Sequence, residues 1–181
     1  MKVNSILLLA VVGLGIAVTA WLDSKNIEQT SYKKIPDIEF QLLDGSKTSL
    51  AQLSDKPIII HFWATWCAPC VVEYPDLVKM ATNKINDVNV ITIAVQNNPK
   101  DILQFFKKNN INIPENVSIA LDPNWQIAKN IFKTSRLPES FLLSRKQEII
   151  KRHNGVVDNW DQSPWIKEFN RLQLDNFVDN K

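Results

Sequence analysis

The chain has 181 residues, of which 45% are hydrophobic and 22% are charged, and its formal net charge is +2. These values are typical of a globular domain, and no basic run is long enough to indicate a nucleic-acid partner. About 150 residues remain after the first two dozen, which is enough for one domain with a buried core.

The N-terminus carries the features of an export signal. Lys2 gives it a positive start, and residues 6–22 form an uncharged apolar run. As a helix this run spans about 25 Å, so it can remain as an anchor in the inner membrane, while the small residues 18–20 also permit cleavage as a signal peptide. Residues 1–22 therefore predict a domain in the periplasm, outside the cytoplasm, where thiols are normally oxidised.

The rest of the chain divides into three predicted parts. Residues 23–34 are polar and aperiodic and predict a tether, residues 35–175 predict the globular domain, and residues 176–181 predict a C-terminal tail. Within the domain, residues 38–50 alternate partly around an Asp-Gly turn pair, which predicts a short N-terminal β-hairpin.

The middle of the domain alternates between strand and helix patterns. Residues 56–64, "KPIIIHFWA", form a continuous apolar and β-branched run, which is typical of a strand buried on both faces of a sheet. Apolar residues at helical spacing follow over 68–84, with Pro75 inside this predicted helix as a kink. The pattern then predicts a strand at 89–95, a helix at 99–109, a strand at 117–121 and a short helix at 124–132.

The end of the domain has a different pattern. After Pro138, the segments "SFLLS" and "EIIKRH" predict an antiparallel hairpin, and residues 160–173 predict a closing helix. Strands that alternate with helices and end in a hairpin imply an α/β fold, with a central mixed β-sheet flanked by helices on both faces.

Both cysteines of the chain lie in "WCAPC", where the buried strand gives way to the helix. Cys67 falls in the first helical turn and Cys70 one turn further, close enough for a disulfide. Unpaired backbone N–H groups and the positive end of the helix dipole stabilise the thiolate form of Cys67, which is therefore the expected nucleophile. Pro69 is tolerated because its missing N–H would have no partner in the first turn.

Two other roles for the pair are weaker. A structural disulfide across three residues closes a very small loop and would stabilise the fold little. A zinc site needs four ligands, and the sequence offers only His61 and His153 as further soft donors, with no second ligand pair. A redox-active dithiol without a metal is the favoured interpretation.

The stretch "FWATWCAPCVVEYP", with Glu73 three residues after Cys70 and then Pro75, closely resembles the active site of the thioredoxin superfamily. It is most similar to the exported, membrane-tethered thiol-disulfide oxidoreductases of the TlpA, ResA and CcmG (DsbE) type, and "LPESFLL" matches their second motif. The resemblance covers about residues 35–173 and implies a thioredoxin fold with an N-terminal β-hairpin.

This resemblance also implies roles for individual residues. Pro138 would be a cis-proline facing the cysteines, and the backbone of Leu137 would pair with the substrate chain. Trp66, Pro69 and Glu139 would complete the substrate-binding surface. Glu139 is also more typical of cytochrome c maturation members than of general thioredoxins, which favour Thr; a surface glutamate at a strand start is its alternative role.

The chain departs from the family pattern at three places. The segments "TSRLPES" and "SRKQE" lack the glycines that the family often has before the X-Pro bond and in the hairpin turn, so the geometry of the hairpin and of the substrate groove is not predicted. His61 stands where this group commonly has Asn. It is either a hydrogen-bonded core histidine or a proton acceptor near Cys70.

The predicted reaction is thiol–disulfide exchange. The Cys67 thiolate attacks a substrate disulfide, and Cys70 then attacks Cys67 to release the reduced product. Because Cys70 must lose its proton, Glu73, one helical turn on, is the first candidate to accept it and His61 the second. The alternative role for Glu73 is that of a solvated helix residue.

The sequence contains no flavin or nicotinamide motif and predicts no cofactor. A reductant in an oxidising compartment needs an electron source, so the resemblance implies a membrane thiol relay protein as donor. Disulfide-containing proteins are the implied substrates, and the CXXCH haem-binding motif of apocytochrome c is the most specific of these.

Two rival functions remain. The first is a disulfide oxidase or isomerase for exported proteins, although Cys-Ala-Pro-Cys lacks the basic residue that such enzymes usually carry between the cysteines. The second is a non-catalytic thioredoxin-fold binding module or copper carrier. Copper is disfavoured because neither Met1 nor Met80 is suitably placed to serve as a soft ligand.

Overall fold

The computed structural model describes residues 33–83, 87–96, 98–164 and 166, which all belong to one compact unit, Tyr32–Lys181. The predicted anchor at 6–22, most of the tether at 23–34 and the tail at 176–181 lie outside these residues. Within the described part of the chain, no helix is both long enough and apolar enough to cross a membrane.

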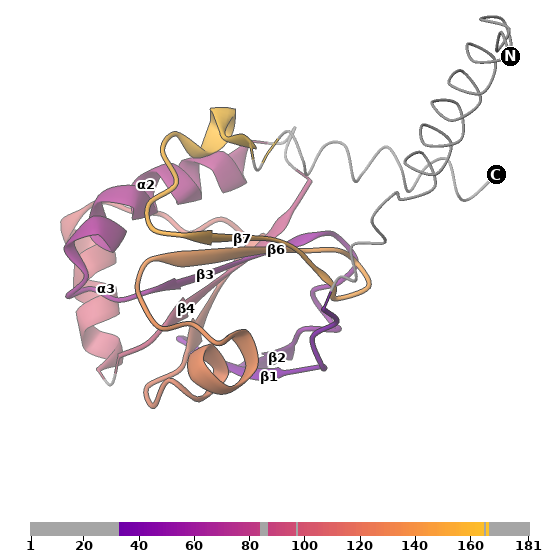
Figure 1. The fold of residues 1–181 in the computed structure, drawn as a ribbon. Helices are drawn as coiled ribbons and strands as arrows, with labels where there is room; N and C mark the ends of the chain where they lie inside the picture. Colours follow the sequence, from indigo (N-terminus) through magenta and orange to yellow (C-terminus); the bar gives the residue numbers. More distant parts are fainter. Residues whose placement is uncertain (1–32, 84–86, 97, 165, 167–181) are drawn as a thin grey trace, which may run out of the picture. The chain divides into compact units, whose positions relative to one another are not determined.

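The described strands form one seven-stranded mixed sheet with the order β2-β1-β5-β4-β3-β6-β7 (Figure 1). The three central strands, β5, β4 and β3, are parallel, and the outer pairs are antiparallel. The predicted mixed sheet and its two hairpins are therefore confirmed. The strands are β1 (Glu39–Leu42), β2 (Lys47–Ser49), β3 (Ile58–Trp63), β4 (Asn89–Ala94), β5 (Val117–Leu121), β6 (Glu139–Leu143) and β7 (Ile149–Asn154).

Strand β3 is buried along its whole length, as its continuous apolar run predicted. Its side chains alternate between the two faces of the sheet. Phe62 packs edge-to-face against Phe132 on one face, whereas Trp63 contacts Tyr74 on the other. The same alternation places His61 on the face of Trp63.

Two helices cover the face of the sheet to which Trp63 points: α2 (Ala68–Thr82) and α3 (Pro99–Lys108). Pro75 lies inside α2, as predicted, and the helix continues past it. The rings of Trp63 and Tyr74 are 4.2 Å apart between centroids, and both also contact Phe105 and Phe106 of α3. This aromatic cluster joins α2 and α3 to the end of β3 from which the cysteines follow.

The opposite face of the sheet is covered by η1 (Ile127–Phe132), the orange helix below the sheet in Figure 1. The predicted short helix in this region is present, but it is a π-helix and begins later than expected. Before it, the buried carboxylate of Asp122 accepts hydrogen bonds from the backbone N–H groups of Gln126 and Ala128, at 2.7 and 2.8 Å. Lys133 ends it with a φ of 57°, in the left-handed region.

The turn between β6 and β7 forms without the glycine that the family often has there. Gln147 adopts a φ of 63°, which glycine reaches without strain and a glutamine does not. Its backbone N–H donates to the Ser144 carbonyl at 2.9 Å, so the turn is closed by an ordinary hydrogen bond. The departure in "SRKQE" therefore leaves the hairpin intact.

The domain begins earlier than predicted, and its predicted end at residue 175 lies outside the described residues. Lys33 and Lys34, at the end of the predicted tether, pair with the start of β7: the Lys33 carbonyl accepts from Ile149 N–H at 3.0 Å, and Lys34 forms an antiparallel bridge with Glu148. This pairing satisfies backbone groups of an edge strand. At the other end, the predicted closing helix begins as a 3-10 helix, η2 (Trp160–Gln162), and most of its remaining residues lie outside those described.

Candidate functional site

The two cysteines form a disulfide where β3 leads into α2, and their Cα atoms are 5.2 Å apart. Cys67 immediately precedes the helix and has an extended backbone, and Pro69 lies in the first turn. Cys67 retains 6% of its surface exposed, whereas Cys70 is completely buried. Cys67 thus keeps a small contact with solvent that Cys70 lacks, and the order of attack stays a prediction.

The start of α2 favours a thiolate at Cys67. Among the described residues, no side chain caps this helix end, and its first turn contains no acidic residue. The free backbone N–H groups and the positive end of the helix dipole therefore act on the Cys67 sulfur without competition from a nearby carboxylate. This arrangement is typical of reactive cysteines.

The peptide bond between Leu137 and Pro138 is cis, as the resemblance implied. Phe62 pairs with Glu139 in the antiparallel register of β3 and β6, so the start of β6 lies beside the end of β3. The cis-proline therefore lies at the same edge of the sheet as the cysteines. Its carbonyl accepts a hydrogen bond from Gly155 N–H at 2.9 Å, which ties the loop to the end of β7.

The predicted substrate-binding residues differ in their exposure. Trp66, next to the disulfide, is 64% exposed, which is unusual for so large an apolar side chain and is common at protein-binding sites. Pro69 is also exposed, and Leu137 is half-buried. These three side chains are accessible to a substrate chain.

Glu139 occupies a different kind of position. It is completely buried, so the alternative of a surface glutamate is wrong, and its carboxylate is not accessible to a substrate in this structure. One oxygen accepts a hydrogen bond from Arg152 Nε. Arg152 also donates to the Lys133 carbonyl at 3.2 Å and lies over the Phe141 ring. The pair therefore holds the end of η1 against the β6–β7 hairpin.

Glu73 lies on the buried side of α2, three residues after Cys70. It is only 3% exposed, so the alternative of a solvated helix residue is wrong. Its Oε1 accepts two hydrogen bonds, from Val157 N–H at 3.1 Å and from the Trp160 indole N–H at 3.0 Å. Its Oε2 is buried and has no hydrogen-bond partner among the described residues.

The protein environment of Glu73 stabilises its protonated carboxyl relative to the same group in water. Burial raises the pKa of Glu73 to about 7, and the nearby charges of Asp158 and Asp76 act in the same direction. The two hydrogen bonds to Oε1 oppose this change, because they favour the carboxylate. A carboxyl with this pKa can exchange a proton with a thiol near neutral pH.

His61 is completely buried on the sheet face below α2. Its Nδ1 lies 2.9 Å from the hydroxyl oxygen of Ser140, its partner across β3 and β6, and its ring packs edge-to-face against Tyr74 and Trp160. Burial lowers the pKa of His61 to about 3, so the ring is neutral at pH 7 and is a poor proton acceptor. These observations favour the core-histidine interpretation.

Two residues that contact Glu73 were not predicted from the sequence. Val157 and Trp160 lie more than 80 positions further along the chain, Val157 in the segment after β7 and Trp160 at the first position of η2. No local pattern connects them to α2. The one available signal is Trp160 itself, because an indole N–H that becomes buried needs an acceptor.

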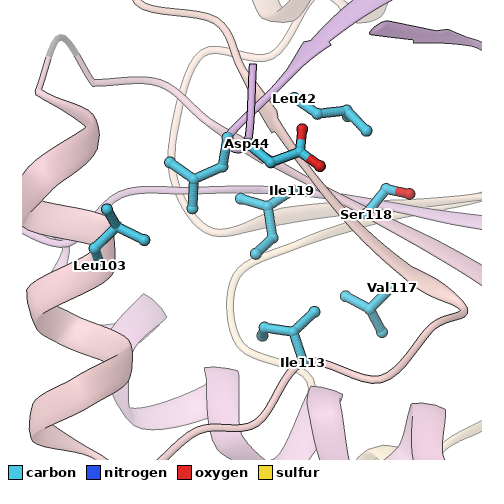
Figure 2. Close-up of a pocket in the computed structure, with 8 residues that line it drawn as sticks. Leu42, Asp44, Leu103, Ile113, Val117, Ser118 and Ile119 are labelled. Carbon is cyan, nitrogen blue, oxygen red and sulfur yellow. The ribbon is translucent and has the colours of Figure 1, made fainter. Parts of the chain in front are cut away.

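An apolar hollow of about 360 Å³ lies between the β1–β2 turn, α3 and the start of β5 (Figure 2). Because β5 runs parallel to β3, its start lies at the sheet edge opposite the cysteines, so the hollow is not part of the redox centre. Within the described ranges, no group of three or more His, Cys, Asp or Glu side chains is arranged to hold a metal ion. The hollow is lined by Leu42, Leu43, Asp44, Leu103, Ile113, Val117, Ser118 and Ile119.

The chain is similar to known thiol-disulfide oxidoreductases. The thiol-disulfide oxidoreductase ResA of Bacillus subtilis (strain 168) is 24% identical over 157 residues, which cover 85% of this chain and 84% of ResA. Sporulation thiol-disulfide oxidoreductase A of the same organism is 26% identical over 158 residues, which cover 84% of this chain and 92% of that protein. The crystal structure of StoA from Bacillus subtilis matches with a TM-score of 0.58 at 22% identity, over 76% of this chain and 96% of StoA.

The family model described as Redoxin matches residues 30–165, a range that includes every described strand, both cysteines and the cis-proline. The mixed sheet with its flanking helices is the thioredoxin-like fold of the similar solved structures. The chain therefore belongs to the Redoxin family, and Cys67 and Cys70 form the redox-active pair of a thiol–disulfide oxidoreductase.

Proposed function

We propose that this protein reduces disulfides in exported protein substrates. The observation that supports this most strongly is the buried Glu73 carboxyl, one helical turn after Cys70, with its pKa raised to about 7. A reductant releases its product when the second thiol attacks, and that thiol must first lose a proton near neutral pH. Ala68 and Pro69 carry no positive charge that would stabilise the reduced dithiol, as an oxidant requires.

The reaction begins with the dithiol. The Cys67 thiolate forms a bond to one substrate sulfur, the substrate S–S bond breaks, and the other substrate sulfur leaves as a thiolate. Cys70 then gives its proton to Glu73 and attacks Cys67 Sγ, which releases the second substrate thiolate and closes the Cys67–Cys70 disulfide. Two electrons pass to the substrate, and the disulfide-bonded state of the structure corresponds to the oxidised product.

Substrate binding is proposed to use the exposed groups around Cys67. The backbone of Leu137, before the cis-proline, pairs with the extended substrate chain, in the manner of a strand added to a sheet edge. Trp66 and Pro69 supply apolar contact beside the reacting sulfur. Glu139 does not touch the substrate. It contributes by holding this loop through its hydrogen bond from Arg152.

The proposed site of action is the extracytoplasmic side of the inner membrane, with residues 6–22 as the anchor. The apolar run and its positive start support this location. Because the thiols of that compartment are oxidised, a membrane thiol relay protein is the proposed electron donor that restores the dithiol.

Apocytochrome c is the proposed substrate, through the disulfide of its CXXCH motif. The support is the glutamate that follows the cis-proline in "LPESFLL", which is the feature shared with cytochrome c maturation proteins. The full burial of this glutamate and its pair with Arg152 support a role in holding the loop before β6.

A comparison of two oxidised peptides tests the proposal. The reduced full-length protein should reduce a CXXCH peptide several-fold faster than a CXXCA peptide of the same length, measured by thiol release in a stopped-flow instrument. Equal rates would refute the apocytochrome c assignment and leave a general reductant. Failure to reduce either peptide, together with rapid oxidation of the dithiol peptides by the disulfide form, would refute the reducing role and support an oxidase.

A further inference from the structure

We propose that Trp160 is a positioning residue for Glu73. Its indole N–H, together with the backbone N–H of Val157, holds Oε1, so that Oε2 is the oxygen that exchanges the proton with Cys70. This inference rests on the function proposed for Glu73 and adds to it the group that orients the carboxyl.

The two oxygens of Glu73 have different surroundings. Oε1 accepts the indole N–H of Trp160 at 3.0 Å and the backbone N–H of Val157 at 3.1 Å, whereas Oε2 is buried without a hydrogen-bond partner among the described residues. A carboxyl oxygen that already accepts two donors has little remaining capacity for a proton. A proton from Cys70, one turn earlier on the same buried side of α2, therefore binds to Oε2.

Trp160 is itself held in a single place by α2 and β3. Its side chain is completely buried, and its backbone N–H donates to Asp76 Oδ2 at 2.8 Å. The ring also packs edge-to-face against His61, with centroids 6.2 Å apart. Two carboxylates one turn apart on α2 thus bind the same residue, Glu73 through the indole and Asp76 through the backbone.

The charges around Glu73 predict the direction of the effect. Asp76 on α2 and Asp158 beside Val157 are acidic and disfavour a negative charge on Glu73. His61, which packs against the indole, is neutral. The two N–H donors are the groups that favour the carboxylate. Loss of the indole N–H should therefore raise the pKa of Glu73, so that the carboxyl ionises only at higher pH.

The test uses Trp160→Phe in the full-length protein, which keeps an aromatic ring and removes the N–H. The reduced protein is mixed with the disulfide of 5-thio-2-nitrobenzoate, which releases one coloured thiolate on attack by Cys67 and a second on attack by Cys70. The pH midpoint of the second phase should rise by about one unit or more. The first phase should be unchanged, and the matched control Trp125→Phe, whose ring packs under Lys129 and is not a donor to Glu73 in the described part of the chain, should shift neither phase.

A second readout does not depend on catalysis. The carboxyl carbon of Glu73, followed by NMR in the oxidised protein, should titrate at higher pH in Trp160→Phe than in the wild type. If phenylalanine prevents folding, 3-benzothienylalanine at position 160 keeps the shape of the bicyclic ring without the N–H, and the same shift is expected.

The outcomes separate this inference from the function on which it rests. An unchanged NMR midpoint in a folded variant overturns the positioning role, whatever Glu73 does in the reaction. If the NMR midpoint shifts and the second phase does not, Glu73 accepts no proton from Cys70. That result overturns the proposed function of Glu73 and, with it, this inference. A shift of both midpoints, absent in a Glu73→Gln background, supports the proposal.

Discussion

Replacement of Cys67 by serine should reduce the rate of disulfide reduction to that of uncatalysed exchange. Cys67 keeps 6% of its surface exposed and lies at the unshielded helix start that stabilises a thiolate, whereas Cys70 is completely buried. The rate of insulin reduction in the presence of dithiothreitol measures this loss.

The matched variant Cys70→Ser should behave differently. It keeps the attacking thiol and lacks the resolving one, so it should accumulate a mixed disulfide with the substrate that is visible by mass spectrometry under non-reducing conditions. If Cys67→Ser traps the substrate and Cys70→Ser does not, the two roles are reversed.

Glu73→Gln should slow release of the substrate from the mixed disulfide by about tenfold or more, with little effect on the first attack. The amide keeps the shape of the side chain and cannot accept the proton of Cys70. In the wild type the releasing step should become faster as the pH rises through about 7, where the carboxyl ionises, and this inflection should be lost in the variant. Rapid mixing over a range of pH separates the two steps.

His61→Asn serves as the control for this experiment. The ring of His61 is neutral and hydrogen-bonded to Ser140, so the variant should alter stability more than the rate of release. If His61→Asn slows release while Glu73→Gln leaves both steps unchanged, the base is His61. The two thiols and Glu73 are neighbours, so their ionisations in the reduced protein are coupled. The pKa values measured there describe the three groups together and not single residues.

The stability of the Glu73→Gln variant provides a second readout. The pKa of Glu73 in the folded protein is about 7, above its ordinary value of 4.5, so the folded state binds this proton more tightly than the unfolded chain. The resulting stabilisation is fully present below pH 4.5 and is lost as the pH rises through 7. The loss should be on the order of 3 kcal/mol, as the change in pKa from 4.5 to about 7 implies, and should be absent in the variant. Urea unfolding of the oxidised protein measures it.

Much of the fold follows from local patterns in the sequence. The apolar run of β3 is continuous because both faces of this central strand are covered, and the Asp44-Gly45 pair marks the β1–β2 turn, where Gly45 has a φ of 88°. The cysteines, Pro138 and Glu73 were predicted because they lie in two compact motifs. These features need no knowledge of contacts between distant segments.

The features that the sequence did not predict depend on such distant contacts. Lys33 and Lys34 belong to the domain because they pair with the β7 edge more than 100 positions away, and no pattern within residues 23–34 indicates this. Glu139 was expected at the substrate-binding surface or, as the alternative, as a surface glutamate at a strand start, and its burial depends on the β6–β7 hairpin that brings Arg152 to it.

The same reason explains why the site was only partly predicted. The Cys67–Cys70 pair and Glu73 share one helix, so their spacing alone indicates that they lie together. Val157 and Trp160 reach Glu73 only because the segment after β7 folds back onto α2. His61 was identified as a departure from the family, but its burial and its bond to Ser140 depend on the register of β3 against β6.

The equilibrium reduction potential of the Cys67–Cys70 pair tests the reducing role most directly. The protein is equilibrated in glutathione and dithiothreitol buffers of known potential, and the fraction of disulfide is measured after the thiols are trapped by alkylation. A potential near or below that of thioredoxin, roughly −270 mV, is the predicted result. A potential near roughly −120 mV, as in strongly oxidising bacterial disulfide catalysts, would contradict the reducing role, because the dithiol would then be too stable to give up its electrons.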